Sequence, residues 1–305
     1  MFVRYIIQAA IAFIPLFASG YSLDYIATKA IKTAFVQQAP ASRSQHSADT
    51  YSRHTVVKGS PGSDCSDQHA FGSPVALDDR TMQRSFFLCR IGYASMYDPT
   101  TKTPRWVAQR ITAQSIEGSS NRKKSQFEED NQIPSKDNVR LSDYKGSGVD
   151  KGHLAPAGDF KFSQDAMNQS FLLTNIVPQD SEHNRTIWAN LEGSVRELAA
   201  RRGELYVITG PIFTPTPDTI GRGVWVPYAM FKVVIDAKRK EMTAFIIKND
   251  SAQGEDPARF QVTVRDVERA TGLNFNPNLN RSEADRMEVG GGDWVIPKVR
   301  VRFKN

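Results

Sequence analysis

Four consecutive residues, Asp150-Lys151-Gly152-His153, combine a carboxylate, a cation, a glycine and an imidazole in one short stretch. Imidazole is the side chain whose unperturbed pKa, roughly 6.5, suits it to accept a proton near neutral pH. Several glycines and a proline surround the stretch, at positions 146, 148, 156 and 158. We therefore expect a strand end or a tight loop there, not a helix interior. Taken alone, the same residues would also fit an ordinary surface turn.

A second set of candidate residues, Asn184, Glu192 and Arg196, follows on a segment that we expect to be helical. Eight helical residues separate Asn184 from Glu192 by about 12 Å along the axis, which disfavours direct binding of one ion by both. One amide oxygen on the ion, with the carboxylate acting through a coordinated water, suits Mg²⁺, because this ion keeps most of its waters. Arg196 is placed to pair with Glu192.

Each member of this set also has a purely structural explanation. Asn184 could cap the helix, as Asn commonly does. Glu192 and Arg196 could form an exposed pair four residues apart, worth a few tenths of a kcal/mol. Asn175, upstream, could close a turn before Pro178. The set becomes more informative when it is read together with the histidine in its glycine-rich stretch.

An amphipathic helix and several strands must position these residues. Apolar residues at three- and four-residue spacing predict a helix from about Asn184 to Arg202 that stops at Gly203. A second helix is expected over Val262–Thr271, and a long polar loop over residues 117–148. Strands are expected at Ser85–Tyr93, Arg105–Ile111, Ser170–Pro178, Leu205–Gly210, Ala229–Ile235, Met242–Ile247 and Val295–Phe303, with a turn over Tyr97–Thr100. These elements predict an α+β fold, a central antiparallel sheet flanked by helices.

The 305-residue chain divides by composition into three parts. Residues 1–20 contain Arg4 near their start, then an apolar run, and small residues at their end, which is the pattern of a signal peptide. The alternative is an anchor that is not cleaved. Residues 21–64 would be a short helix and a polar linker, and residues 65–305 the functional domain. We therefore expect an exported protein, periplasmic or secreted, with no stable membrane domain after cleavage. Two cysteines, Cys65 and Cys89, are expected to form a disulfide.

The charge balance favours a polyanionic partner. Lys and Arg number 39 against 33 Asp and Glu, giving a net charge of +6. Neutralisation of phosphates by Lys and Arg drives affinity for nucleic acid. No Cys-x-x-Cys motif is present, which excludes a cysteine-rich zinc site, and no sequence-reading DNA-binding motif is found.

The motifs together resemble the DNA/RNA non-specific endonucleases, the ββα-metal (His-Me finger) family. The resemblance is carried by residues 150–156, by residues 173–179, and by Asn184 with Trp188, Leu191 and Glu192. It extends from about Cys89 to Thr271 and includes Thr209-Gly210-Pro211 and the segment from Val226 to Lys232.

The resemblance implies a role for each matching residue. His153 corresponds to the general base that activates water, and Asn184 to the direct ligand of Mg²⁺, for which Mn²⁺ could substitute. Glu192 corresponds to the carboxylate that holds metal-bound water, and Asn175 to a residue that orients the base. The remaining site residues are Asp150 and Lys151 beside the base, Arg122 near the phosphate and Arg196 near the carboxylate. The family motif has Arg where this chain has Lys151, and Lys lacks the planar fork that holds phosphate with two parallel hydrogen bonds.

The function that these expectations imply is Mg²⁺-dependent endonucleolytic hydrolysis of DNA and RNA to 5′-phosphate ends. The partners would be single- and double-stranded DNA and RNA, bound through their phosphate backbones. The sequence does not decide whether the protein forms a homodimer. Two rival functions remain: a phosphodiesterase for small phosphoesters, and a catalytically weak or inactive exported protein that binds nucleic acid on the same scaffold.

Overall fold

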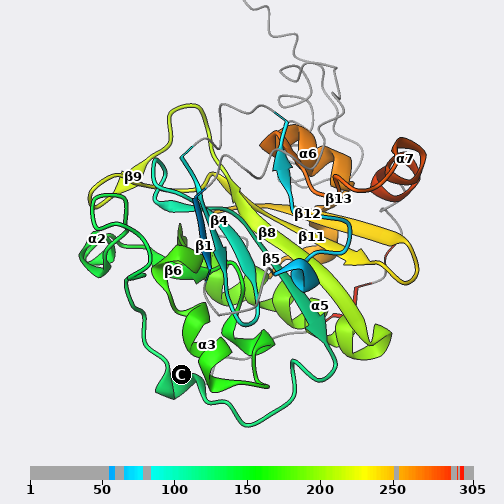
Figure 1. Cartoon of the computed structure of the whole chain (residues 1–305), viewed down its shortest axis with the longest axis horizontal. Coiled ribbons are helices and arrows are strands. Elements are labelled where there is room, and N and C mark those ends of the chain that lie inside the picture. Colours follow the sequence, from blue (N-terminus) through cyan, green and yellow to red (C-terminus); the bar gives the residue numbers. More distant parts are fainter. Residues whose placement is uncertain are drawn as a thin grey trace, which may run out of the picture. The chain divides into compact units, whose positions relative to one another are not determined.

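An eight-stranded sheet, in the order β1-β3-β4-β5-β8-β11-β12-β13, organises the part of the chain that the computed structural model describes (Figure 1). That part comprises residues 55–58, 65–77, 84–250, 254–289, 294 and 296–298. β1 pairs with β3 in parallel, and the other pairings are antiparallel. In that order the strands span Thr55–Lys58, Phe86–Cys89, Ala94–Asp98, Thr103–Thr112, Glu204–Ile212, Ala229–Asp236, Glu241–Lys248 and Gln261–Val262.

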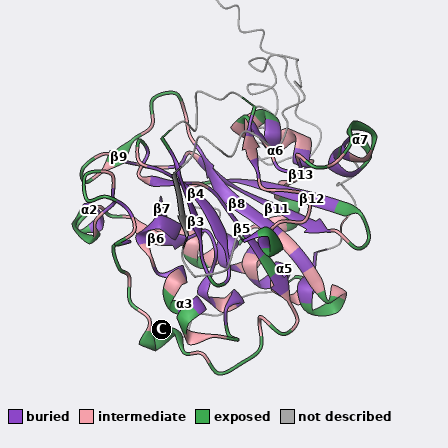
Figure 2. Ribbon diagram, in the orientation of Figure 1, coloured by how far each residue is buried: buried purple, intermediate pink, exposed green. Residues whose placement is uncertain are grey.

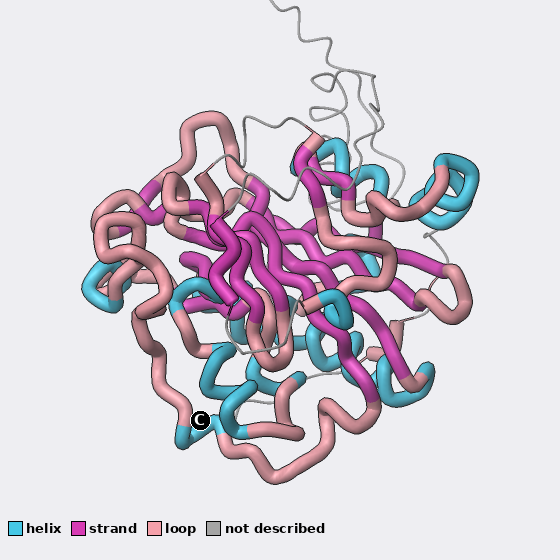
Figure 3. Tube along the Cα trace, in the orientation of Figure 1, coloured by secondary structure: helices cyan, strands magenta, loops and turns pink. Residues whose placement is uncertain are grey.

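Three two-stranded sheets complete the strands. One of them, β6 (Asp150–His153) with β7 (Ile176–Gln179), contains the motif with the imidazole. The others pair β9 (Thr219–Ile220) with β10 (Val224–Trp225) and β2 (Val75–Ala76) with β14 (Leu273–Asn274). The tube in Figure 3 shows these short strands (magenta) at the margins of the large sheet.

Helices cover both faces of the large sheet. α5 (Ala189–Arg202) packs on one face, where Leu191, Val195 and Leu198 join Met230 and Val234 of β11 in one apolar core. The alternate residues of β11 point the other way, and Phe231 contacts Phe275 there, next to α6 (Val264–Thr271). α7 (Arg281–Val289) follows α6. Because both faces are covered, the central strands are buried along most of their length (Figure 2).

The expected fold is confirmed, with local differences. The strand expected over Ser85–Tyr93 ends at Cys89, because the chain turns at Arg90, and the missed strand β4 follows. The strand expected over Ser170–Pro178 is reduced to β7, since a missed helix, α3 (Gln164–Ser170), and a 3₁₀ turn, η6 (Leu173–Asn175), precede it. The expected strands near residues 205, 229 and 242 are confirmed as β8, β11 and β12, and the second helix as α6.

The segment between β5 and β8 is inserted between two neighbouring strands, since these strands pair over Val107–Thr112 and Glu204–Thr209. The insertion, residues 113–203, carries β6, β7, α3, α5 and the long polar loop with two short turns, η4 (Arg122–Lys124) and α2 (Leu141–Tyr144). All eight residues proposed from sequence for the site lie within it.

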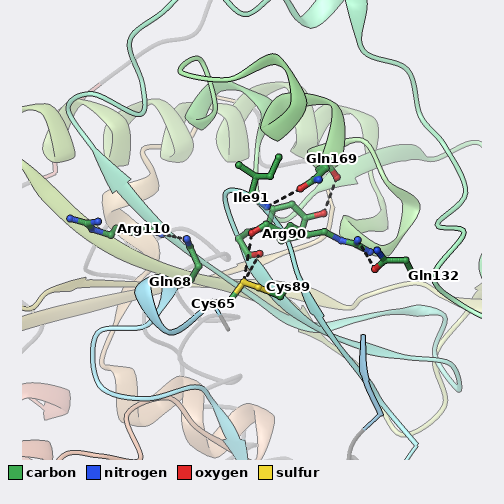
Figure 4. The surroundings of a disulfide bond; sticks show 9 residues. Cys65, Gln68, Cys89, Arg90, Ile91, Arg110, Gln132 and Gln169 are labelled. Carbon is green, nitrogen blue, oxygen red and sulfur yellow. Dashed lines mark hydrogen bonds between the residues drawn. A yellow bond between two sulfur atoms is a disulfide. The ribbon is translucent and has the colours of Figure 1, made fainter. Parts of the chain in front are cut away.

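The long loop is tied to the sheet by a buried ion pair. Arg90, just after β3, pairs with Asp130, and both side chains are almost fully buried. Asp130 also accepts a hydrogen bond from Thr174 Oγ1 at 2.6 Å, and Arg90 donates to Gln132 at 2.7 Å. Next to Arg90, a disulfide joins Cys65 and Cys89, as expected (Figure 4). Ile91 N donates to Gln169 of α3 in the same view.

Several expectations fall outside the described residues. These are the signal peptide, the short helix and the polar linker, apart from β1, and most of the expected strand Val295–Phe303. The boundary at residue 65 therefore stays a prediction. None of the helices in the described part of the chain combines the length and hydropathy that crossing a bilayer requires.

Candidate functional site

The candidate site is built on a hairpin followed by a helix. β6 and β7 pair antiparallel, with His153 opposite Ile176 and Asp150 opposite Gln179. Gly152 is required in β6, because a Cβ there would lie 1.9 Å from Oε1 of Gln179. It is a strand residue in contact with a neighbour, not the hinge that its type suggests.

His153 lies at the end of β6 and is 7% exposed. Its ring packs against two phenylalanines, with centroid distances of 5.3 Å to Phe127 and 4.8 Å to Phe171, and the two phenylalanine rings contact each other at 5.0 Å. Burial, together with the charge of Arg122, lowers the pKa of His153 to about 3. Its Nε2 is buried and makes no hydrogen bond to any described residue. The site therefore contains a neutral imidazole with an unused nitrogen.

Asn175 fixes the backbone that follows the imidazole. Its side chain accepts a hydrogen bond from Ala155 N at 3.0 Å and donates to the carbonyl oxygens of Ala155 and Ser170, at 2.9 and 2.7 Å. Its own carbonyl accepts from Leu154 N at 3.0 Å. Asn175 is fully buried, so these bonds are shielded from water. The residue holds the loop after β6 and does not merely close a turn.

Asp150, at the other end of β6, connects the hairpin to the helix. Its carboxylate accepts from Asn184 Nδ2 at 2.9 Å, from Ser181 Oγ at 2.9 Å and from two guanidinium nitrogens of Arg185. Burial raises the pKa of this carboxyl, but the hydrogen bonds from Asn184, Arg185 and Ser181 outweigh it and the net shift is downward. The hydrogen bond from Nδ2 to Asp150 therefore fixes the orientation of the Asn184 amide.

Asn184 does not cap its helix. The cap is Asp180, whose carboxylate accepts from the backbone of Glu182 and His183 ahead of α4 (Ser181–His183). Asn184 opens η7 (Asn184–Trp188), a π-helical turn that continues into α5. π-turns inside helices occur frequently at functional sites. Within the described residues Asn184 Oδ1 makes no hydrogen bond, so this oxygen is available to a ligand.

The pairing of Arg196 differs from the expected one. Its Nη1 donates to Asp159 at 2.8 Å, and Gln109 of β5 donates to the other oxygen of Asp159 at 2.7 Å. Asp159 is buried beneath α5, so it captures the guanidinium at close range. Glu192 makes no hydrogen bond to the described residues. Burial raises its pKa to about 7, against the lowering effects of Lys232 and Arg196.

Lys232 reaches the same place from the sheet. It is 1% exposed, donates to Thr209 Oγ1 at 2.7 Å, and lies 4.9 Å from the ring centroid of Trp188 in η7. Burial lowers the pKa of Lys232 to about 8, and the charge of Glu192 acts in the opposite direction. An ammonium group therefore lies in the core beneath the metal-binding candidates.

Two exposed or half-exposed cations lie on the aromatic rings that flank His153. Arg122 is 5.4 Å from the Phe171 ring centroid. Lys151 Nζ is 5.1 Å from the Phe127 centroid and 5.7 Å from that of Tyr144. Each of the two phosphate-binding candidates therefore lies on one of the two phenylalanine rings that pack against the imidazole.

The residues fit a weakly coordinated hard cation. The Asn184 oxygen and the Glu192 carboxylate are both unpaired within the described residues, and oxygen is the ligand type that Mg²⁺ prefers. No group of three or more His, Cys, Asp or Glu side chains in the described part of the chain could hold a metal. A site in which one amide oxygen and water supply the ligands requires no such group.

Lys232, Asp159, Gln109 and Phe127 lie at the site, but the sequence did not identify their roles. One signal was available, because Lys232 interrupts the apolar run of β11, where a charge is costly to bury. Asp159 and Gln109 gave none, since their contacts depend on how the insertion packs against the sheet.

Comparison with known proteins identifies relatives over most of this region. The family model described as "DNA/RNA non-specific endonuclease" matches residues 78–282. The human mitochondrial nuclease EXOG is 36% identical over 213 residues, which cover 64% of this chain and 58% of that protein. Mitochondrial nuclease 1 of Schizosaccharomyces pombe is 36% identical over 64% of this chain and 67% of its own length.

Two further matches extend the comparison. Nuclease C1 of Cunninghamella echinulata is 36% identical over 70% of this chain and 88% of its own length. The crystal structure of the EndoG/EndoGI complex contains a chain with a TM-score of 0.62 and 31% identity, over 65% of this chain and 88% of that one. The fold is therefore that of EndoG, the expected ββα-metal fold.

The expectation of an exported protein, periplasmic or secreted, is wrong on this comparison. The human and S. pombe relatives, and bovine endonuclease G, are named mitochondrial nucleases, and this finding overturns the expected export. The expectation rested on a basic residue before an apolar run. Segments that direct proteins to mitochondria are also basic and poor in acids, and residues 1–23 contain Arg4 and no Asp or Glu. That pattern does not separate the two destinations.

Proposed function

The chain belongs to the DNA/RNA non-specific endonuclease family, and from this premise we propose that it is a metal-dependent endonuclease that hydrolyses phosphodiester bonds in DNA and RNA. The chain spans 58% of human EXOG, so the proposal concerns the shared nuclease region. Mg²⁺ is the proposed metal, with Mn²⁺ as a substitute.

One observation carries the proposal. The four-residue strand β6 has a neutral, buried imidazole at one end and, at the other, a carboxylate that orients the Asn184 amide. Because Asn184 Nδ2 is engaged by Asp150, the amide oxygen is the atom left for a ligand. A proton acceptor and a cation ligand are thereby linked through a single strand.

His153 is the proposed general base. Its imidazole accepts a proton from the water that attacks phosphorus. The hydrogen bonds between the Asn175 side chain and the backbone of Ala155 keep the ring in place during the transfer. A base with a pKa of about 3 is weak in the free protein. A phosphate bound next to Arg122 offsets the positive charge that helps to lower this pKa, so substrate binding makes His153 a stronger base.

Asn184 would hold the cation through Oδ1, and Glu192 would accept hydrogen bonds from its surrounding waters. When bound, the cation supplies positive charge that stabilises the charge developing on the phosphate and the leaving oxygen. Lys232 favours the ionised form of Glu192, since its ammonium lowers the carboxyl pKa and opposes the effect of burial. Arg196 pairs with Asp159, and this pairing holds α5 over the sheet.

Arg122 and Lys151 are the proposed phosphate-binding residues. Both are cations held against the rings next to His153. Backbone contacts carry no sequence information, so cleavage is expected with low sequence preference and strong salt dependence. Water is the proposed nucleophile and not the ribose 2′-hydroxyl, so both DNA and RNA are substrates and the products carry 5′-phosphates.

The direct test is digestion of supercoiled plasmid DNA and of structured RNA with Mg²⁺, with EDTA as the control. Nicking and linearisation of the plasmid, together with RNA fragmentation, are expected only with the metal. Ligation of the fragments without prior phosphorylation reports 5′-phosphate ends. If neither polymer is cut, the endonuclease function is rejected.

His153→Ala is the matching mutational prediction. Loss of the base is expected to reduce plasmid nicking by about 10²- to 10⁴-fold, while DNA binding in EDTA is retained. His69→Ala is the control, because His69 is a shielded histidine that contacts Trp106 outside the site. Near-normal cleavage by His153→Ala would remove this residue from the base role.

A further inference from the structure

A basic turn beside the site carries two lysines that the proposed chemistry does not use. In η4, Arg122 is followed by Lys123 and Lys124, and all three residues are exposed. Neither lysine forms an ion pair with any described residue. Successive residues of a 3₁₀ turn point in different directions, so with Arg122 over Phe171 the two lysines extend away from that ring.

The turn is held rigidly in spite of its exposure. Asn121 caps it, with Oδ1 accepting from Lys123 N at 2.9 Å, and Asn121 N donates to Gln164 Oε1 of α3 at 2.9 Å. The amide of Gln164 bonds to Ser125 Oγ at 3.1 Å and to Asn168 at 3.0 Å, and Ser125 Oγ bonds to Asn168 at 2.7 Å. Two side chains of α3 thus clamp both ends of the turn, so little ordering remains to be done on binding.

An exposed aromatic residue lies next to this clamp. Phe162 is 48% exposed, although large aromatic side chains are usually well buried. Its backbone adjoins the segment that leads into η4, since Ser120 N donates to Lys161 O and a Cβ at Gly118 would lie 3.3 Å from Phe162 Cα. An exposed ring beside unpaired cations is the combination on which single-stranded nucleic acids bind, by base stacking and phosphate contact.

We propose that the clamped turn Asn121–Ser125 and the ring of Phe162 form a strand-holding surface, on which a single nucleic-acid strand is bound next to the scissile phosphate. This inference rests on the proposed nuclease function and narrows it. Lys123 and Lys124 contact phosphates that flank the reacting one, and Phe162 stacks on an unpaired base. The surface makes the enzyme select polymers over small phosphoesters, and single strands over duplexes.

The local charges are consistent with this surface. Asp165 is exposed on α3 next to Gln164, but it pairs with neither lysine among the described residues. Arg122 lies 5.4 Å from the ring centroid of Phe171, and that ring lies 4.8 Å from the ring of His153, so the turn adjoins the reacting centre. A strand that follows the turn therefore reaches the imidazole.

Binding in EDTA tests the inference without cleavage. The affinity of the full-length protein for a fluorescein-labelled oligothymidylate and for a duplex of the same length is measured by anisotropy over a salt series. Lys123→Ala/Lys124→Ala is expected to reduce the slope of log K against log salt by about 1.4 on the single strand. Phe162→Ala is expected to weaken single-strand binding roughly tenfold, to leave the slope unchanged and to leave duplex binding near wild type.

The charge control is Lys238→Ala/Lys240→Ala, which removes two lysines from the turn between β11 and β12, where Lys240 pairs with Glu283 at 3.0 Å. Arg202, the last residue of α5, pairs with Asp236 and Glu241 beside this turn, so the turn lies about 20 Å along α5 from the helix end that follows Asn184. Thermal unfolding checks that each variant is folded. The proposed surface is overturned if the slope of log K against log salt is unchanged in the Lys123→Ala/Lys124→Ala variant, or if the slope falls equally in the control variant. The stacking role of Phe162 is overturned if Phe162→Ala weakens duplex binding as much as single-strand binding. Metal-dependent cleavage is scored separately, so the inference can fail while the nuclease function stands.

Discussion

At the scale of single residues, the site depends on two ionisable groups whose pKa values are moved in opposite directions by the same cause. Burial lowers the pKa of His153 to about 3 and raises that of Glu192 to about 7. The imidazole is therefore neutral over the whole range in which the carboxyl titrates. Loss of activity on acidification is expected to report Glu192 and not His153.

Lys232→Met tests how Glu192 is kept ionised. The change removes the cation that lowers the pKa of Glu192 most, so the acid limb of the pH–rate profile is expected to move up by about one pH unit. Met fills a similar volume, and Thr209→Val is the control, since it removes the hydrogen-bond partner and keeps the charge. An unmoved profile would contradict the role.

Asp150→Ala tests the orientation of the Asn184 amide. Without the carboxylate, Asn184 Nδ2 loses its partner, so the half-saturating Mg²⁺ concentration for plasmid cleavage is expected to rise about tenfold. Arg185→Ala is the control, because it removes another partner of Asp150 and leaves the Asp150–Asn184 bond. An unchanged Mg²⁺ requirement in Asp150→Ala would show that the amide is oriented without it.

Residue chemistry was readable from sequence where the residues form local motifs. The Asp150–His153 stretch and the helix with Asn184 and Glu192 each lie on a continuous segment, so spacing grouped the residues within each segment, and the family resemblance implied their roles. The partner of Arg196 was not readable, because Asp159 comes beneath α5 only after folding. Lys232 contacts Trp188 across two elements, and no spacing rule encodes such a contact.

At the scale of elements, the helix that carries Asn184 was expected as a regular one and is not. Its apolar spacing and its end at Gly203, where φ is 87°, follow the sequence signals. The π-turn over Asn184–Trp188 was not signalled, because π and α turns share similar residue preferences and differ in hydrogen bonding. The helix cap is Asp180 and not Asn184, so the Asn184 side chain is left for other contacts.

Asp130→Ala tests how the long loop is attached to the sheet. Removal of the carboxylate leaves Arg90 buried without its partner, so the free energy of unfolding is expected to fall by about 3–5 kcal/mol. Asp137→Ala is the control, since Asp137 is an acid of the same loop whose contact to Tyr97 is made by its backbone carbonyl. Urea denaturation measures both. Equal stability of the two variants would contradict an anchoring role for the Arg90–Asp130 pair.

At the scale of the whole molecule, buried histidines should make stability depend on pH. The pKa values of His69 and His183 are lowered to about 4, and that of His153 to about 3, mainly by burial. Between these values and the unfolded value of roughly 6.5, the unfolded chain binds more protons, so stability rises with pH in that window. Glu192 acts in the opposite sense between 4.5 and about 7, but it is one group against three.

The expected outcome is a lower free energy of unfolding at pH 5 than at pH 7, measured by urea denaturation at both. His69→Leu, outside the site, should reduce the difference by more than a third, since it removes one of the three histidine contributions while Glu192 offsets part of their sum. Equal or greater stability at pH 5 would contradict the assignment of these histidines as neutral in the folded state.

The fold class was predictable because apolar runs such as β11 and β12 can be read as a hairpin from one continuous segment. The order of the large sheet was not. β5 pairs with β8 across about ninety intervening residues, and β1 pairs in parallel with β3. Such pairings are decided by tertiary packing, which leaves no local pattern.

The insertion between β5 and β8 has a consequence for how such a site could be inherited or transplanted. Residues 113–203 behave as a cassette that enters and leaves the sheet at neighbouring strands. The cassette is not self-sufficient, because Gln109 of β5 supports Asp159 and Lys232 of β11 contacts Trp188 from the strands on either side of β8. A protein that received this insertion would have to provide a glutamine and a lysine at the strand positions that correspond to Gln109 of β5 and Lys232 of β11. Without them the transplanted helix would lie on a sheet that leaves the buried carboxylate of Asp159 and the half-buried carboxylate of Glu192 without their polar neighbours.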